Sequence, residues 1–255
     1  MKIAALRLLV LVLLLGIWEF ASGRLVSAFF ISKPSSIGAK FWSILIDGTL
    51  LRNMGITASE AVTGFIVGGL AGAIVGLALG RSVTLAKVFD PFITAFYSMP
   101  KVALAPLFIL WFGVDFQMRV LFTAVIVFFL VFLNTYTGVR NVSRELMTVF
   151  RLMGARESHL ARMVVVPSAI TWVFAGLRLS VPYALIGAIV AEIMAGNSGL
   201  GYMVEHAAAQ FDTSGVFAAL LGVMILALAL NLAVKLLERV LMPWRDAGEQ
   251  REVTV

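Results

Sequence analysis

The sequence contains no cysteine and only two histidines among its 255 residues. The chain therefore forms no disulfide and carries no thiolate nucleophile, and two isolated histidines without clustered carboxylates do not favour a metal site. It also lacks a phosphate-binding Gly-Lys-Ser/Thr run and the Gly-x-Ser-x-Gly and His-Glu-x-x-His patterns of hydrolytic enzymes. We therefore predict that the chain is not an enzyme and has no ATP site, so that energy for its work comes from another protein.

Charge is also scarce, because only 13% of the residues are charged, 61% are hydrophobic and the mean hydropathy is +1.00. This composition is typical of an integral membrane protein, in which each spanning helix needs about 20 apolar residues. Six segments meet this need: 3–20, 56–80, 89–112, 119–137, 167–195 and 216–241. No linker separates them, so we predict an all-α, polytopic membrane protein with about six transmembrane helices in one domain, 1–255.

Lys and Arg residues predict the orientation, because they gather on the cytoplasmic side of membrane proteins. With both termini inside, thirteen of the twenty basic residues lie on the cytoplasmic side and five lie outside. The net charge is +6, but the basic residues are distributed by membrane side and are not gathered on one soluble face. The charge therefore does not indicate nucleic-acid binding. The first segment resembles a signal peptide in length, but no convincing cleavage site follows it, and we expect it to be retained as a span.

Glycine recurs every fourth residue in the second span, at Gly64, Gly68, Gly72 and Gly76. Such spacing leaves one helix face bare and permits close van der Waals contact between helices in lipid. We expect this face to pack within the chain, with a dimer interface as the alternative.

Proline interrupts the third span at Pro91, Pro100 and Pro106, so this segment cannot be one uninterrupted helix. Lys101 lies between the last two prolines, about 20 Å from the inner boundary at 1.5 Å per residue. A buried ammonium is costly and marks a functional site by default. Two readings stay open: Lys101 attracts an anionic solute in a translocation pathway, or it binds carbonyl groups that the prolines release.

Two further charges, Arg178 and Glu192, lie in the fifth span on either side of Pro182. Fourteen residues separate them, or about 20 Å along an ideal helix, so they do not form a simple pair. Arg178 is expected to snorkel inward or to contact the solute, and Glu192 to act as a gate contact at the outer mouth or to cap a helix end.

The segment 139–167 between the fourth and fifth spans is amphipathic and lies on the predicted cytoplasmic side. Leu146, Val149, Phe150 and Met153 fall at the i, i+3, i+4 and i+7 positions of one helical stripe, and Gly154 ends the pattern. A second short helical run follows and stops before Pro167, so the pattern predicts helix, glycine elbow and helix. Such a segment either docks on a cytoplasmic partner or rests on anionic lipid headgroups.

This segment resembles the cytoplasmic loop of ABC importer permeases, whose consensus is Glu-Ala-Ala, three residues, Gly, nine residues and Ile-x-Leu-Pro. Gly154, Ala155, Val164, Val166 and Pro167 fit, whereas residues 148–150 (Thr-Val-Phe) replace the Glu-Ala-Ala triplet. The stretch 100–107 (Pro-Lys-Val-Ala-Leu-Ala-Pro-Leu) with Trp-Phe-Gly at 111–113 is similar to the nitrate, sulfonate and taurine branch of that family.

The resemblance implies a type I ABC importer permease fold with a core module at about 56–241. It implies a homodimer in the inner membrane, two cytoplasmic ATPase subunits that bind ATP and Mg²⁺, and an external solute-binding protein. In the family the loop carries the coupling helix that docks on the ATPase. The resemblance assigns this docking role to a loop with Thr148, Arg151, Gly154, Ala155, Arg156, His159 and Pro167.

The predicted solute is a small anion such as a sulfonate, nitrate or taurine, because basic residues are embedded in the spans. The same branch also resembles permeases for thiamine precursors and other small organic solutes. One rival function is an ion-coupled secondary transporter, which the embedded charges and broken spans would suit but which leaves the loop unexplained. Another is an intramembrane enzyme, which would need a nucleophile and a base, and Ser98 beside Lys101 is the only candidate and a weak one.

Overall fold

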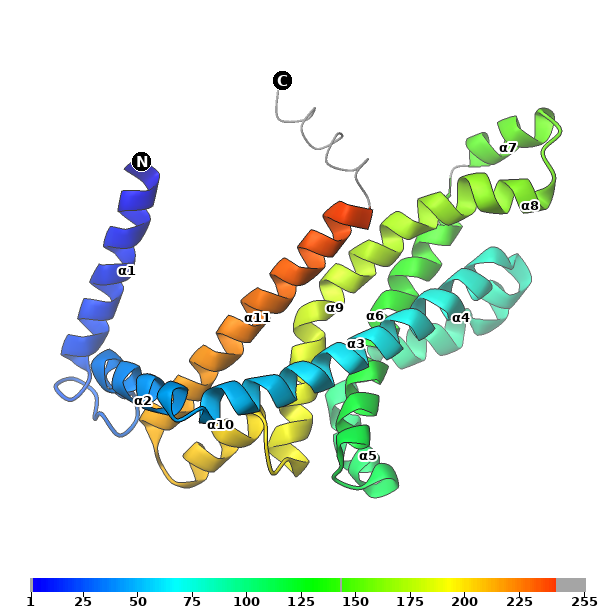
Figure 1. The fold of residues 1–255 in the computed structure, drawn as a ribbon. Coiled ribbons are helices and arrows are strands. Elements are labelled where there is room, and N and C mark those ends of the chain that lie inside the picture. Colours follow the sequence, from blue (N-terminus) through cyan, green and yellow to red (C-terminus); the bar gives the residue numbers. More distant parts are fainter. Residues whose placement is uncertain (1, 143, 242–255) are drawn as a thin grey trace. The chain divides into compact units, whose positions relative to one another are not determined.

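The structure, a computed structural model, describes residues 2–142 and 144–241. Every regular element in these two ranges is helical, apart from an isolated β-bridge between Ser22 and Val26 (Figure 1). The helices are α1 (Lys2–Ala21), α2 (Pro34–Ile46), α3 (Thr49–Arg81), α4 (Val83–Ser98), η1 (Lys101–Leu104), α5 (Ala105–Phe112), α6 (Phe116–Arg140), α7 (Arg144–Leu152), α8 (Glu157–Leu160), η2 (Ala161–Val165), α9 (Val166–Ala195), α10 (Leu200–Ala209) and α11 (Thr213–Leu241). The predicted all-α class is confirmed.

The number of membrane-crossing helices is close to the predicted six. Within the described ranges four helices, α3, α6, α9 and α11, are long and apolar enough to cross a membrane. Helix α4 followed by η1 and α5 makes a fifth span if the bent pair crosses together. The first predicted span corresponds to α1, which has 20 residues and so a length of about 30 Å.

Contacts divide the chain into two compact units, Met1–Ala58 with Glu192–Leu226 and Ser59–Ala191 with Ala227–Val255. We call them the α10-bearing unit and the loop-bearing unit, because the first contains α10 and the second contains the segment with α7 and α8. The single transmembrane domain stays a prediction, and each unit is described by itself.

In the loop-bearing unit α3 and α6 approach so closely that glycine is required between them. A Cβ atom on Gly64 or Gly76 would lie 2.6–2.7 Å from the side chain of Thr123 or Thr135, and one on Gly72 would lie 2.6 Å from the Phe128 carbonyl oxygen. These distances are shorter than real Cβ contacts. The four-residue glycine repeat of α3 therefore faces α6 of the same chain.

Two apolar clusters fill the spaces around this helix pair. Val127, Val131 and Ala184 are buried and join α6 to α9, with Phe65 and Leu177 packed beside them. The second cluster consists of Ala86, Phe132 and Tyr136, which joins α4 to α6. Helix α6 is thus the central element of the unit, as its continuous line of buried residues also shows.

In the α10-bearing unit α1, α2 and the turn before α11 are tied together by polar contacts. The Glu19 carboxylate accepts hydrogen bonds from the backbone N–H and the hydroxyl of Ser35, at 3.0 and 2.7 Å. Lys40 Nζ lies 2.9 Å from the Asp212 carboxylate, and this hydrogen bond lowers the pKa of Asp212 below its usual range. The stability from this half-exposed pair is therefore present above the ordinary aspartate pKa and is lost as the pH falls below it.

The close approach of α3 and α6 gives a testable prediction for Gly68→Ala. The new methyl group would overlap the Ala124 carbonyl group, so the helices would have to separate. Overpacking of this kind costs about 1–3 kcal/mol, and the melting temperature of the detergent-purified chain, followed by tryptophan fluorescence, should fall.

Gly55→Ala is the matched control in the same helix, because nothing lies within 4 Å of the Cβ position of Gly55. This variant should melt at or above the wild-type temperature, since alanine favours the helix. Equal melting temperatures for the two variants would contradict the proposed close contact.

Candidate functional site

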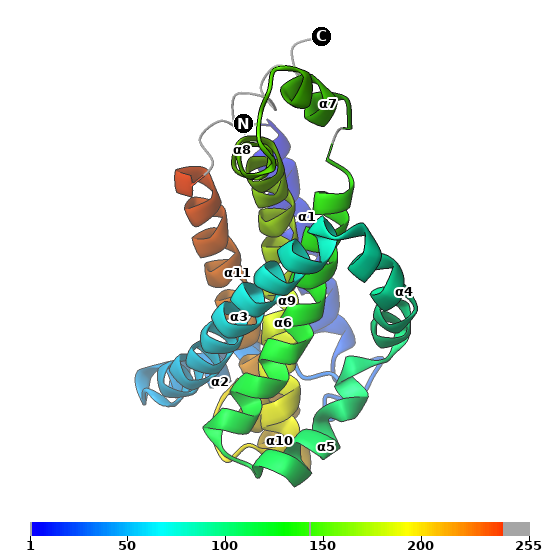
Figure 2. The same ribbon diagram turned by 90° about the vertical axis from the view of Figure 1, so that its right-hand side faces the viewer.

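The segment between α6 and α9 forms a small helical hairpin with its own apolar core. Helices α7 and α8 project together beyond the ends of α6 and α9 (Figures 1 and 2). Val142, Leu160 and Val164 are buried between them, and Met147 and Phe150 of α7 pack against this cluster. This core fixes the direction in which the rest of α7 faces.

Gly154 makes the turn of this hairpin. Its φ angle is +80°, in the region that favours glycine. The N–H of Ala155 donates to the Phe150 carbonyl at 3.0 Å, and that of Gly154 donates to the Arg151 carbonyl at 2.9 Å. This pair of bonds is a Schellman motif, which satisfies carbonyls left open at the end of α7. The prediction of helix, glycine elbow and helix is confirmed.

The predicted single apolar stripe of α7 is wrong in detail. Phe150 turns into the hairpin core, whereas Val149 and Met153 are 51% and 78% exposed. Leu152, which the stripe did not include, is 84% exposed, and the side chain of Leu146 lies outside the described residues. Because α8 and η2 cover one side of α7, the helix has an inward and an outward apolar face. The periodicity of the sequence alone does not distinguish these two faces.

The outward face is apolar and surrounded by polar groups. Val149, Leu152 and Met153 form its apolar part, which we call the α7 patch. The other predicted loop residues Thr148, Arg151, Arg156 and His159 are exposed, and Ala155 is half-buried. Pro167, also exposed, is the second residue of α9, and the helical run continues through it from η2 without a gap, so the predicted stop of the second run before Pro167 is wrong.

The third predicted span is broken, as its prolines indicate. Helices α4 and α5 meet at a bend of 84°. Pro100 precedes η1, Pro106 lies in the first turn of α5 and Pro91 lies inside α4. In the same segment the Ser98 hydroxyl donates to the Thr94 carbonyl at 2.9 Å, so this bond occupies the side chain that the enzyme alternative would need as a nucleophile.

Lys101 lies at this break. Its Nζ donates to the carbonyl of Tyr97 at 2.8 Å and lies 5.1 and 5.2 Å from the ring centres of Tyr97 and Phe129. The Tyr97 carbonyl is available because α4 ends at Ser98. This geometry fits the reading in which the lysine binds a carbonyl released by the prolines, and it leaves the ammonium half-exposed and in contact with neutral groups.

Arg178 of α9 lies near a carboxylate of α11. One of its guanidinium nitrogens is 3.9 Å from the Glu238 carboxylate, and its side chain is 56% exposed. Glu238 is three residues from the end of α11. This contact places Arg178 at the level of the last turn of α11.

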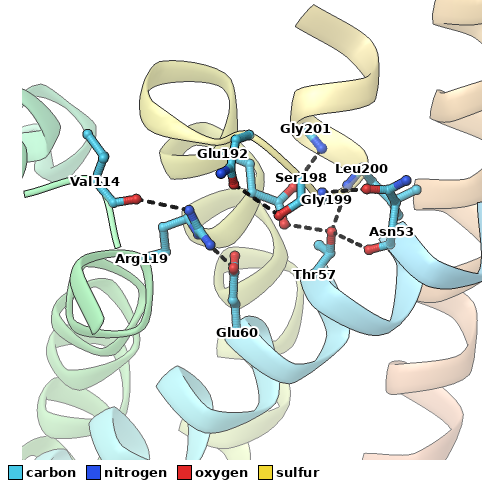
Figure 3. A network of polar contacts seen from close by, with 11 residues as sticks. Asn53, Thr57, Glu60, Val114, Arg119, Glu192, Ser198, Gly199, Leu200 and Gly201 are labelled. Carbon is cyan, nitrogen blue, oxygen red and sulfur yellow. Dashed lines mark hydrogen bonds and ion pairs between the residues drawn. The ribbon is translucent and has the colours of Figure 1, made fainter. Parts of the chain in front are cut away.

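Glu192 is completely buried and binds the start of α10 (Figure 3). Its carboxylate accepts hydrogen bonds from the Thr57 hydroxyl and from the Gly201 N–H, each at 2.6 Å. The Thr57 hydroxyl in turn accepts from the Leu200 N–H at 2.8 Å, and the Asn53 side-chain carbonyl accepts from the Gly199 N–H at 2.7 Å. We call these three side chains, Asn53, Thr57 and Glu192, the α10 cap.

The α10 cap places a negative group at a helix N-terminus, where the helix dipole favours it. Gly199 has a φ angle of +104°, and a Cβ atom there would overlap the Glu192 carboxylate. A glycine is therefore required at this position. Of the two readings of Glu192 from sequence, this geometry matches a helix-capping side chain.

Sequence reasoning missed a second buried charge pair, Glu60 and Arg119. The Arg119 side chain donates to the Glu60 carboxylate at 2.6 Å and to the Val114 carbonyl at 3.1 Å (Figure 3). The side chains of Glu60 and Arg119 are 0% and 7% exposed. Arg119 is one of the five basic residues that the charge count in the sequence assigns to the outer side of the membrane. The available signal was a carboxylate inside the second predicted span and an arginine at the start of the fourth, both near the predicted outer boundary.

The described residues contain no group of three or more His, Cys, Asp or Glu side chains that could hold a metal ion. Their polar clusters instead bind backbone or each other.

Comparisons with known proteins agree on one family. The family model for "Binding-protein-dependent transport system inner membrane component" matches residues 64–243. The aliphatic sulfonates transport permease protein SsuC of Bacillus subtilis (strain 168) is 33% identical over 243 residues, which cover 95% of this chain and 88% of SsuC. The formylaminopyrimidine transport permease protein ThiX of Halalkalibacterium halodurans is 31% identical over 233 residues, covering 91% of this chain and 93% of ThiX.

A chain in the crystal structure of an amino acid ABC transporter with histidines shares the fold. Its TM-score is 0.62 at 18% sequence identity, over 78% of this chain and 97% of that one. The fold is therefore that of an ABC importer permease.

The α10 cap predicts that Thr57→Val destabilises the chain. The substitution keeps the side-chain volume but leaves the Glu192 carboxylate and the Leu200 N–H each without one hydrogen bond. A buried polar group that loses its partner costs about 1–3 kcal/mol, so the purified variant should melt at a lower temperature. Thr63→Val in the same helix is the control, and an equal loss in both variants would refute the special role of Thr57.

Proposed function

The chain belongs to the binding-protein-dependent transport system inner membrane components, and from that premise we propose how it couples ATP hydrolysis to the import of a small solute. As a permease subunit of an ABC importer it lies in the inner membrane, performs no covalent chemistry, and works with an ATPase and a solute-binding protein. Two copies of the chain would enclose the pathway, and the ATPase partner would bind ATP and Mg²⁺. Both termini would lie in the cytoplasm, as the distribution of Lys and Arg supports.

The α7 patch is the surface that we assign to ATPase docking. An amphipathic helix binds a groove through apolar anchors at i, i+3 and i+4, and Val149, Leu152 and Met153 have this spacing. Arg151 and Arg156 lie beside them as exposed basic groups. This exposed apolar face on a hairpin with its own core is the observation that carries the proposal. A hairpin with its own core can transmit a displacement of the ATPase to α6 and α9.

The solute we favour is a sulfonate-like anion. Its support is the sequence similarity to SsuC and the half-exposed ammonium of Lys101 at a break in a span. A thiamine precursor is the alternative, since ThiX is similar over nearly the same length. The solute-binding protein is expected to set much of the selectivity between these classes.

The function can be tested by reconstituting the chain in liposomes with its ATPase and solute-binding protein. Uptake of alkyl sulfonates should require ATP and all three proteins. Uptake driven by an ion gradient without ATP would instead support a secondary transporter.

Gly154→Asp tests the role of the hairpin. A side chain at a φ angle of +80° costs about 1–2 kcal/mol and should tilt α7 relative to α8. We expect membrane insertion to persist and ATP-driven uptake to be lost, as measured by flotation and by solute uptake. Ser158→Asp adds the same charge to an exposed position of the same hairpin and should retain uptake. Normal uptake by Gly154→Asp would refute the assigned coupling role.

Lys101→Met tests the pathway reading against the structural one. Methionine keeps most of the side-chain length but removes the ammonium group and its charge. If Lys101 attracts the solute, sulfonate uptake should fall at least about tenfold, a loss of roughly 1.4 kcal/mol, at an unchanged melting temperature. A lower melting temperature with intact uptake would assign Lys101 to the Tyr97 carbonyl alone, and Lys101→Arg is the charge-retaining control.

A further inference from the structure

The Lys101 ammonium lies among aromatic rings of α4 and α6, all within the loop-bearing unit. Its Nζ is 5.1 Å from the ring centre of Tyr97 and 5.2 Å from that of Phe129. The Phe129 ring stacks on Phe96 at 6.1 Å and meets Phe128 in a T-shaped contact at 5.3 Å. The cation thus lies over two rings, and contacts with two other rings already fix one of these, Phe129.

This ammonium has capacity for a ligand. Of its three N–H donors, one binds the Tyr97 carbonyl at 2.8 Å. Within residues 2–142 and 144–241 Lys101 makes no other hydrogen bond and no ion pair. One carbonyl does not neutralise the charge, and a charge within a span faces a water-filled space when no opposite charge pairs with it. Two donors therefore point to a side of the helices that a dissolved anion can reach.

The Tyr97 ring is open on this same side. Tyr97 is 57% exposed, and in the part of the chain that the structure describes its ring pairs with no other ring. Because its centre is 5.1 Å from the ammonium, the ring borders the space that the ammonium faces. A solute whose charged group binds Lys101 would therefore carry the rest of its body past an aromatic surface.

From this arrangement we propose that the site formed by Lys101 and Tyr97 prefers an anion carried on an aromatic ring, such as an aryl sulfonate, to one carried on a short alkyl chain. The sulfonate oxygens would accept hydrogen bonds from the ammonium, and the solute ring would stack on Tyr97. Aromatic pairs gain free energy beyond the area that they bury. The inference rests on the proposed function, since it takes Lys101 to be part of the translocation pathway, and it makes Tyr97 the residue that selects among anions.

The charges of the site favour this class of solute over two others. A neutral aromatic ring could stack on Tyr97, but it would offer no negative group to the ammonium. A cationic solute would be repelled by Lys101, which already lies over the Tyr97 and Phe129 rings. Only an anion with an aromatic body uses both the ammonium and the open ring.

Saturation-transfer NMR of the full chain in nanodiscs of deuterated lipid tests the proposal. Benzenesulfonate and ethanesulfonate carry the same anionic group on a ring and on an ethyl chain, so titration with each gives two Kd values whose ratio reports the ring. We expect wild type to bind benzenesulfonate about tenfold more tightly, which corresponds to roughly 1.4 kcal/mol. Empty nanodiscs correct for partitioning into lipid.

Tyr97→Leu removes the ring and keeps the backbone carbonyl that binds Lys101. Its Kd for benzenesulfonate should rise about tenfold, to the value for ethanesulfonate, while its Kd for ethanesulfonate stays as in wild type. Tyr97→Phe should keep the preference, because the ring remains. Phe92→Leu is the matched control and should behave as wild type, since Phe92 is 58% exposed on the same helix and its ring pairs with Phe89.

Equal Kd values for the two anions in wild type, or saturation transfer to neither, would overturn the proposal without any variant. A preference that survives Tyr97→Leu, or that Phe92→Leu abolishes equally, would also overturn it. The measurement uses no ATP, no ATPase and no solute-binding protein. ATP-driven uptake can therefore succeed where this preference fails, and failure of the proposal is distinguishable from failure of the importer function.

Discussion

The fold depends on one constraint, that every backbone polar group within a membrane must find a partner inside the protein. A straight helix meets this requirement by its own hydrogen bonds. Each break in a helix leaves backbone donors or acceptors that need new partners. At the break before η1 the Lys101 ammonium binds the carbonyl of Tyr97. At the start of α10 the side chains of the α10 cap accept hydrogen bonds from the N–H groups of residues 199–201. At these two breaks polar side chains thus supply the partners that the helix itself no longer provides.

The same constraint explains why α3 carries both glycine and buried polar groups. Its glycine face reaches the backbone of α6 directly, and this is van der Waals contact to which the glycines contribute no side chain. Its first three turns instead carry Asn53 and Thr57, which belong to the α10 cap. Glu60 follows one turn later and holds Arg119 in the loop-bearing unit. One helix therefore contributes structural contacts to both units through residues of different chemistry.

The sequence allowed the class of fold, most spans and the helical hairpin to be predicted, because these follow from local patterns. Long apolar runs, the proline break near Lys101 and Gly154 each determine structure within a few residues of themselves. The partners of embedded charges could not be found this way, since Thr57 and Glu192 are 135 residues apart and Glu60 and Arg119 are 59 apart. The local sequence also could not predict which face of α7 turns inward, because this depends on contacts with Leu160 and Val164 of the following helices.

These contacts change how well each embedded charged residue is supported as part of the translocation pathway. Glu192 is fully buried and accepts hydrogen bonds from two groups, so a solute would have to dismantle the start of α10 to reach it. Arg178 already has a carboxylate nearby, which offsets part of its attraction for an anion. The groups that contact Lys101 are a carbonyl and two aromatic rings, all neutral. No carboxylate among these contacts balances its positive charge. Of Lys101, Arg178 and Glu192, Lys101 therefore has the strongest physical reason to attract an anion.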